Sequence, residues 1–302
     1  MALIEATNIV KDYSGHRALD NLNITVDEGT IYGLLGPNGA GKTTFIRILN
    51  QITKPDSGDV FFNGHKLCPT DIELIGYLPE ERGLYKKMRV GEQALFLAQL
   101  KGMSKADATT KLKMWFEKFG ISDWWYKKVE ELSKGMQQKV QFITTVLHEP
   151  RLLIFDEPFS GFDPVNANLL KNEILQLKEN GATIIFSTHN MSSVEEICDN
   201  ITLINKSKAV LTGSVWDVKQ KYKECLFNIK FVGDANNLTT DETLEITNIK
   251  QERDYQTALV RPRTNMTANE LIRYMIEKIE LISFEEKLPS MNEIFIKTVS
   301  QK

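Results

Sequence analysis

The stretch GLLGPNGAGKTTFIRIL carries the residue types that bind phosphate. Its glycines let backbone N–H groups turn toward an anion, Lys42 adds a positive charge, and the Thr43 hydroxyl can ligate Mg²⁺. An apolar strand precedes the stretch and an amphipathic helix follows it, which favours a phosphate loop over a chance glycine-rich turn. The residues expected to bind nucleotide phosphates are Gly36, Pro37, Asn38, Gly39, Ala40, Gly41, Lys42, Thr43 and Thr44.

Two acidic residues, Asp156 and Glu157, follow a second apolar run in RLLIFDEP. A strand there would deliver both carboxylates at its carboxyl end, where ligands bind in open α/β sheets. Asp156 can hold Mg²⁺, and Glu157 can polarise an attacking water as a general base. An isolated pair of this kind also fits a capped loop, but a phosphate loop in the same chain favours nucleotide hydrolysis.

A third stretch, VEELSKGMQQKVQ, holds no obvious nucleophile and no metal-ligand pair, yet it has the features of an anion-binding helix start. Ser133 suits a helix N-cap, Gly135 leaves the first turn open, and Lys134 adds a full charge to the positive end of the helix dipole. An ordinary capped helix is the competing interpretation. The residues themselves leave both open.

The bulk composition describes an ordinary globular protein. The 302 residues are 42% hydrophobic and 25% charged, and a net charge of −3 gives no general attraction to nucleic acid or anionic lipid. Three scattered cysteines, Cys68, Cys198 and Cys225, favour reduced thiols. Neither a secretory signal nor an apolar window of spanning length is evident, so we expect a cytoplasmic protein that reaches a membrane only through a partner.

The elements needed to position these residues follow an α/β order. Strand-like runs near the N-terminus suggest an antiparallel contribution, and apolar strands return at RLLIFDEP, ATIIFSTH and NITLINKSKAVLTG. Residues from about 88 to 148 read as a helical insertion into this core. Composition changes near residue 222, where strand runs and a helix follow. We therefore predict a nucleotide-binding domain at 1–220 and a small α+β accessory domain at 221–302.

Together these motifs resemble the nucleotide-binding subunit of an ABC transporter over roughly residues 1 to 215. The resemblance implies a P-loop NTPase with a RecA-like core, and it assigns LSKGMQQ as the family's signature sequence. Tyr13 in KDYSGHRAL matches the aromatic that stacks on adenine, and Asp163 in SGFDP matches a residue at the subunit contact. His189 in FSTHNM matches the switch histidine that reaches the γ-phosphate.

The same resemblance implies a site shared between two copies. In the family, the signature helix of one subunit closes on ATP held by another, so Ser133, Lys134 and Gly135 would bind a nucleotide held by the partner's phosphate loop. The chain departs from the family in two places. Lys134 stands where the signature usually has a glycine, and Glu80 stands where a glutamine usually contacts Mg²⁺ and the attacking water.

The variant LPEERGLYKKM, the SKGMQQKVQ signature and the extra C-terminal domain are similar to one branch, the NatA-like ATP-binding subunits of ABC-2-type exporters. That branch implies ATP and Mg²⁺ as cofactors, a second nucleotide-binding subunit in a homodimer, and a separate membrane permease. The permease would insert a helix into a groove beside the Glu80 loop and the helical insertion. Trp124, Trp125 and Tyr126 lie near this region in sequence, either as partner contacts or as local core.

Two functions of soluble ABC ATPases and a signalling function compete with export. A soluble ABC ATPase acting in translation would resemble two such domains joined by a basic linker, and one acting in DNA maintenance would need a long coiled-coil insertion. This chain has one set of motifs and a short insertion. A signalling ATPase stays open, because Glu157 and His189 argue for hydrolysis without saying what hydrolysis drives.

Overall fold

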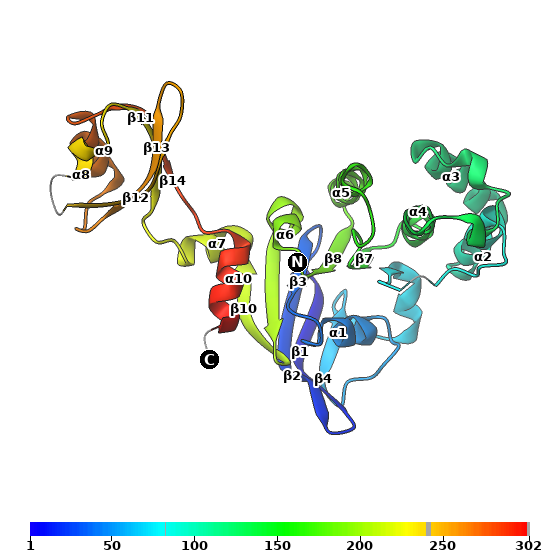
Figure 1. Ribbon diagram of the computed structural model, residues 1–302. Helices are drawn as coiled ribbons and strands as arrows, with labels where there is room; N and C mark the ends of the chain where they lie inside the picture. The colour runs from blue at the N-terminus through cyan, green and yellow to red at the C-terminus, as the bar shows by residue number, and fades with distance from the viewer. Residues whose placement is uncertain (82, 240–242, 301–302) are drawn as a thin grey trace. The chain divides into compact units, whose positions relative to one another are not determined.

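The computed structural model describes residues 1–81, 83–239 and 243–300. This part of the chain forms two compact units: Met1–Val215 with the residues from Thr298 onward, and Trp216–Lys297. We call them the N-terminal and C-terminal units and describe each by itself (Figure 1). The domain boundary that the sequence predicts between residues 220 and 221 stays a prediction.

A six-stranded, mostly parallel sheet forms the centre of the N-terminal unit. Its central strands are short and buried along their whole length, as strands covered on both faces must be. Only the edge strand β10 runs antiparallel, paired with β9. In spatial order the strands are β10 (Lys208–Ser214), β9 (Asn200–Asn205), β3 (Ile31–Leu35), β8 (Thr183–Thr188), β7 (Leu152–Asp156) and β6 (Ile75–Leu78).

An antiparallel sheet packs on the same core, in line with the sequence-based expectation. Helix α1 (Lys42–Leu49) contributes Phe45 and Ile46 to a cluster that also takes side chains from both sheets, so α1 lies between them. Figure 1 shows α5 (Pro164–Glu179) and α6 (Met191–Ile197) on the other side of the parallel sheet. The antiparallel strands, in spatial order, are β2 (His16–Asp27), β1 (Ala2–Tyr13), β4 (Ser57–Phe62) and β5 (His65–Lys66).

The region between β6 and β7 is helical, as predicted for residues 88 to 148. Trp125 packs edge-on to Phe116 at 5.4 Å between ring centroids and lies against Gly91, so it belongs to the local core. Tyr126 is 77% exposed. A 3₁₀ turn, η1 (Pro69–Leu74), leads into β6. The elements of the region itself are α2 (Val90–Leu100), α3 (Lys105–Lys118), the 3₁₀ turns η2 (Ser122–Trp124) and η3 (Val129–Glu131), and α4 (Lys134–Val146).

The C-terminal unit is a four-stranded antiparallel sheet with α8 (Asn236–Thr239) and α9 (Ala268–Ile276) over one face, an α+β arrangement. Phe231, Val260 and Leu271 are among the side chains of its separate hydrophobic core. The strands, in spatial order, are β12 (Leu244–Gln251), β13 (Gln256–Pro262), β11 (Phe227–Val232) and β14 (Glu280–Glu286). The other helices are α7 (Val215–Lys221), which begins at the last residue of the first segment of the N-terminal unit, and α10 (Met291–Ser300), whose residues from Thr298 belong to the N-terminal unit.

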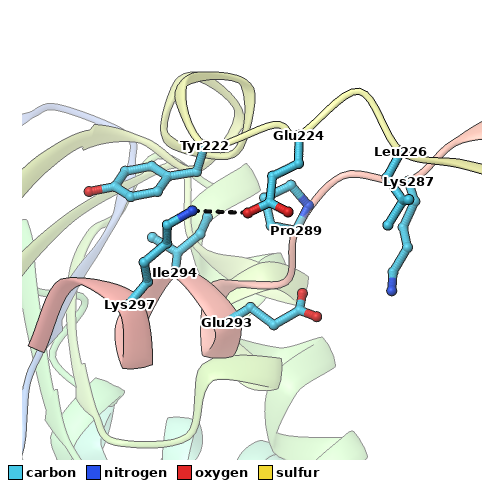
Figure 2. Close-up of a pocket in the computed structure, with 8 residues that line it drawn as sticks. All are labelled: Tyr222, Glu224, Leu226, Lys287, Pro289, Glu293, Ile294 and Lys297. Atoms are coloured by element: carbon cyan, nitrogen blue, oxygen red, sulfur yellow. Dashed lines mark hydrogen bonds and ion pairs between the residues drawn. The ribbon is translucent and has the colours of Figure 1, made fainter. Parts of the chain in front are cut away.

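A small cavity of about 180 Å³ lies in the C-terminal unit between the segment after α7 and the start of α10 (Figure 2). Its carboxylates have partners within the unit. Glu224 accepts hydrogen bonds from Lys297 Nζ and Arg261 Nη2, both at 2.9 Å, and Glu293 accepts from the Ser290 backbone N–H at 2.7 Å. Among the described residues, none of the helices combines the length and the hydropathy that a membrane span requires.

Candidate nucleotide site

The predicted phosphate loop joins buried strand β3 to helix α1, the arrangement that the sequence pattern required. Gly36 has φ 146°, and a Cβ there would lie 2.2 Å from the Ile204 carbonyl oxygen. Gly41 has φ 118°, and a Cβ there would lie 2.5 Å from the Ala18 carbonyl oxygen. Both positions therefore combine a left-handed backbone with contacts that exclude any side chain. The loop's shape follows directly from its glycine spacing.

Lys42 folds back over this loop. Its Nζ donates to the carbonyl oxygens of Gly36 at 2.7 Å and Pro37 at 3.2 Å, and the residue is 7% exposed. Burial lowers the pKa of Lys42, and the carboxylates of Glu157, Asp156 and Glu80 partly offset that effect. The ammonium group thus lies at the phosphate loop, surrounded by acceptors that a bound phosphate can replace.

Strand β7 places Asp156 next to the first turn of α1. Thr43 Oγ1 donates to Asp156 Oδ2 at 3.4 Å, so two of the three predicted Mg²⁺ ligands are neighbours. Burial, together with the nearby carboxylates of Glu80 and Glu157, raises the pKa of Asp156. A divalent cation bound here would offset the repulsion among these carboxylates, because its positive charge favours the ionised form of Asp156.

Glu157 is held in an unusual conformation. Its φ of 50° is in the left-handed region, which costs a non-glycine residue roughly 1–3 kcal/mol and persists where the surroundings enforce it. The Glu157 carboxylate accepts from the His189 backbone N–H at 2.9 Å and from Thr188 Oγ1 at 3.1 Å, and it lies 2.6 Å from His189 Nδ1. Strands β7 and β8 thus bring the predicted base and the predicted switch histidine into direct contact.

A cleft of about 360 Å³ gathers most of the predicted residues, within the roughly 300–1,000 Å³ usual for small-molecule sites. Glu80, which follows β6, reaches the same cleft as the phosphate loop. His189 does not line it; the His189 side chain is 65% exposed beside Glu157. The predicted residues that line the cleft are Tyr13, Asn38, Gly39, Gly41, Lys42, Thr43, Thr44, Glu80, Asp156 and Glu157.

The structure adds His16 and Ala18 to this lining, which the sequence reasoning missed. Tyr13 and His16 are directly paired at the end of the β1–β2 hairpin, and the two turn residues, Ser14 at φ 36° and Gly15 at φ 86°, both have positive φ. A two-residue turn of this type fixes the register of its flanking strands. A Ser-Gly pair between two strand patterns was the signal that could have placed His16 opposite Tyr13.

The predicted signature residues and Asp163 lie together outside the cleft. Ser133 caps α4, as predicted, by accepting from the Met136 backbone N–H at 3.3 Å. Asp163 caps α5 by accepting from the backbone N–H groups of Val165 and Asn166. A Cβ on Gly135 would lie 3.8 Å from the Phe162 ring, so the two helix starts are adjacent. Lys134 is exposed beside them.

Comparison with known proteins agrees with this geometry. Residues 19–160 match the family described as ABC transporter, and residues 213–299 match the family described as ATP-binding protein DrrA1-3-like, C-terminal domain. A solved structure titled as the ATP-binding subunit of an ABC transporter superimposes with a TM-score of 0.69. It is 29% identical and covers 73% of this chain and 93% of its own. The predicted fold, an ABC ATP-binding domain followed by a small C-terminal domain, is confirmed.

Two curated relatives extend the match. The uncharacterized ABC transporter ATP-binding protein YhaQ of Bacillus subtilis is 40% identical over 98% of this chain and 98% of its own length. The ABC transporter ATP-binding protein NatA of the same organism is 32% identical over 66% of this chain and 82% of its own length. The chain therefore belongs to the ATP-binding subunits of ABC transporters, in the branch of ABC-2-type exporters, and it is an ATPase of the kind that powers transport.

Proposed function

We propose that two copies of this chain close around two ATP molecules and drive export through a separate ABC-2-type permease. The observation that carries the proposal is the division of the site. Lys42, Asp156 and Glu157 meet at one cleft, whereas the signature helix start at Ser133 and the Asp163 loop lie together elsewhere on the same unit. A second copy can supply that surface to the cleft, which makes a symmetric dimer the simplest complete site.

In the proposed reaction, backbone N–H groups of the phosphate loop and Lys42 hold the β- and γ-phosphates, and Tyr13 stacks on adenine. The Tyr13 ring is 40% exposed, with Lys11 Nζ 5.4 Å from its centroid, so one face is available to a base. Glu157 takes a proton from the attacking water, and His189 contacts the γ-phosphate. The partner's Ser133, Lys134 and Gly135 complete the phosphate cradle.

Mg²⁺ fits the oxygen ligands at this site. Thr43 Oγ1 and Asp156 Oδ2, 3.4 Å apart, are the hard oxygen donors that Mg²⁺ prefers. Two ligands of one octahedral cation at about 2.1 Å are about 3.0 Å apart, so a shift of a few tenths of an ångström would admit the ion. Glu80 lies at the same cleft and adds a negative charge where the family usually has a neutral amide. Bound there, Mg²⁺ would neutralise charge on the phosphates.

A groove of about 240 Å³ supports the proposed permease contact. It lies where β6 and the loop after it meet α2 and α4, and its lining includes Tyr77, Pro79, Leu97, Leu100 and His148. The exposed rings of Tyr85 and Phe96 contact each other at 6.4 Å between centroids on the same segments. An amphipathic helix can bury its apolar face in such a groove. The Glu80 loop connects this groove to the nucleotide cleft.

The test is purification of the tagged full-length chain from detergent-solubilised native membranes, with identification of the proteins that accompany it. ATPase activity would be measured with and without them. We expect a protein of several membrane spans that stimulates ATP hydrolysis. Recovery of soluble partners alone, with activity in the cytosolic fraction, would instead favour a signalling or other soluble ATPase.

A further inference from the structure

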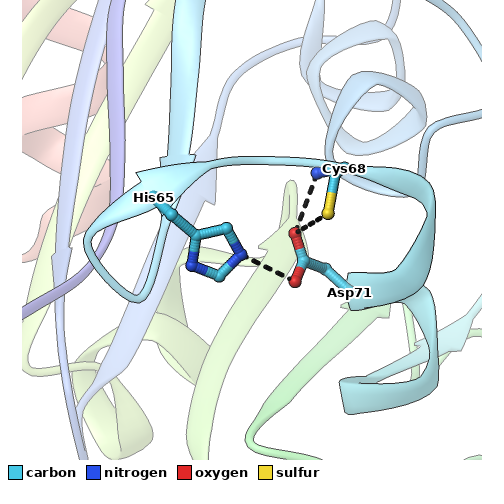
Figure 3. A group of neighbouring side chains, drawn as sticks. All are labelled: His65, Cys68 and Asp71. Carbon is cyan, nitrogen blue, oxygen red and sulfur yellow. Dashed lines mark hydrogen bonds and ion pairs between the residues drawn. The ribbon is translucent and has the colours of Figure 1, made fainter.

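Three metal-ligating side chains converge at the edge of the antiparallel sheet, away from the nucleotide cleft. His65, Cys68 and Asp71 occur three residues apart, and one ligand atom from each lies within 4.8 Å of the other two (Figure 3). A nitrogen, a sulfur and an oxygen donor thus lie within a segment of seven residues. Neither the family matches nor the proposed ATPase chemistry uses this cluster.

The local structure holds each of the three in place. Asn63 at φ 50° and Gly64 at φ 81° form a two-residue turn between β4 and β5, and this hairpin fixes His65 opposite Phe62. The imidazole packs edge-on to the Phe62 ring at 6.3 Å between centroids. Pro69 begins the following 3₁₀ turn η1, so Cys68 is its N-cap and Asp71 lies in its first turn. The ligands therefore stand on a rigid turn and a capped helical turn, which limits the entropy lost on binding an ion.

The Asp71 carboxylate is the centre of the cluster. Its Oδ1 lies 2.9 Å from His65 Nε2, and its Oδ2 lies 3.3 Å from Cys68 Sγ while also accepting from the Cys68 backbone N–H at 2.8 Å. Zinc bonds of about 2.0–2.3 Å in a tetrahedron put neighbouring ligand atoms about 3.3–3.6 Å apart. The His65 Nε2–Asp71 Oδ1 separation of 2.9 Å is a few tenths of an ångström shorter than such an edge, and the ligand atoms of all three residues lie within 4.8 Å of one another. A cation can therefore replace the protons that now link the three groups.

The exposure of the three groups suits an ion that reaches the site from solvent. Asp71 is buried at 5% exposure, whereas the His65 side chain is 52% exposed, which leaves room for a water ligand. Lys66, the nearest positive charge in sequence, is engaged in an ion pair with Asp59. The site thus offers a cation two ligands that can carry negative charge, Cys68 and Asp71, and the nearest lysine in sequence is already paired.

From this geometry we propose that His65, Cys68 and Asp71 bind one Zn²⁺ ion, with water as the fourth ligand. Thiolate and imidazole donors select zinc over the hard cations Mg²⁺ and Ca²⁺, which prefer oxygen alone. The second Asp71 oxygen and the Cys68 backbone N–H keep the carboxylate oriented while the first binds the metal. The bound ion joins the β4–β5 hairpin to η1, which leads directly into β6 and the Glu80 loop.

The alternative is that the cluster only caps η1. A capping role uses the Asp71 carboxylate, the Cys68 backbone N–H and the Cys68 side chain as an acceptor, and it needs neither a thiolate nor the imidazole. Cys68→Ser separates the two roles, because serine keeps the backbone donor and a hydroxyl that can donate to Asp71 but lacks the thiolate. Cys225→Ser is the matched control, since Cys225 is an exposed cysteine in the C-terminal unit.

Cobalt(II) titration of the reduced, metal-free, full-length chain tests the proposal, because cobalt occupies zinc sites and reports its ligands by absorbance. We expect one equivalent of Co²⁺ to give a thiolate-to-metal charge-transfer band, and Zn²⁺ to abolish the band because it binds more tightly. The band should be absent in Cys68→Ser and unchanged in Cys225→Ser. Competition with a chromophoric chelator should show Zn²⁺ affinity at least ~100-fold weaker in Cys68→Ser, since loss of outer partners alone costs about 10–100-fold.

Three results would overturn the zinc site: no charge-transfer band in the natural chain, a band that persists in Cys68→Ser, or a band that requires Cys225. Cation binding at Thr43 and Asp156 cannot mimic the expected result, because those ligands contain no sulfur. Cys198 is buried, and burial raises the pKa of its thiol, so it supplies no accessible thiolate. A melting temperature that rises with Zn²⁺ in the natural chain and not in Cys68→Ser would support the same assignment.

Discussion

Glu157 has two features that a general base needs: a fixed position at the cleft and a direct contact with a second polar group. Its backbone is in the left-handed region, and hydrogen bonds from Thr188 and His189 hold the carboxylate in place. In the proposed reaction Asp156 would bind the cation while Glu157 remains available for water. The backbone geometry is consistent with these two proposed roles.

Glu157→Gln should keep ATP binding and lower the hydrolysis rate by about 10²–10⁴-fold, the usual contribution of a general base. In the proposed dimer the shared site would close on ATP without hydrolysing it, so the variant should accumulate ATP-dependent dimers in Mg²⁺-ATP. Size-exclusion chromatography with light scattering would measure the dimer fraction. Lys42→Ala is the control and should lose nucleotide binding. A Glu157→Gln chain that stays monomeric in excess Mg²⁺-ATP would contradict the shared site.

His148 makes stability depend on pH. Burial, with a further contribution from Lys101, lowers its pKa from 6.5 to about 4, so the folded chain keeps the imidazole neutral. Between those values the unfolded chain binds more protons than the folded chain, and the free energy of unfolding therefore falls as the pH drops from about 6.5 to about 4. Urea unfolding at several pH values should show this loss in the natural chain and a flatter profile in His148→Gln. His16→Gln, which alters an exposed histidine, should follow the natural chain.

At the scale of elements, the packing of α2 on the turn around Trp125 can be tested directly. A Cβ on Gly91 would lie 2.5–2.6 Å from three atoms of the Trp125 indole. Because Phe116 confines that ring, we expect Gly91→Ala to lower the free energy of unfolding by about 1–3 kcal/mol. Gly83→Ala is the matched control, since nothing lies within 4 Å of its Cβ position. Equal melting temperatures for the two variants would contradict the packing.

Elements with strong local patterns could be predicted from the sequence, and those that depend on pairing could not. The phosphate loop and strand β7 were evident because glycine spacing and a continuous apolar run act within a few residues. His16 was missed because its place in the cleft depends on hairpin register. The cluster of His65, Cys68 and Asp71 was missed because the β4–β5 hairpin was not identified, although Asn63-Gly64 is a strong turn signal. The four-residue helix α8 left no periodic pattern to detect.

At the scale of the whole molecule, the groove beside the Glu80 loop offers a test of the proposed permease contact. Leu100 lines this groove and is 64% exposed, so Leu100→Glu should fold normally. The carboxylate would be buried without a partner in the complex, at a cost of several kcal/mol, and permease recovery should fall at least ~10-fold. Nucleotide binding should be unchanged, because Leu100 does not line the cleft. Met114→Glu on α3, at 65% exposure, is the control. Equal permease recovery with Leu100→Glu and Met114→Glu would place the contact elsewhere.

The back-folded Lys42 has a consequence for ligand discrimination. Two carbonyl oxygens of its own loop already accept hydrogen bonds from the ammonium, so a molecule that displaces them must offer a stronger acceptor than a neutral amide. Charged phosphate oxygens meet that condition, because hydrogen bonds to ionised groups are roughly twice as strong as neutral ones. Adenosine, which shares the base and sugar, does not. Adenosine would thus be rejected because it has no phosphate to bind Lys42, even though its base could stack on Tyr13.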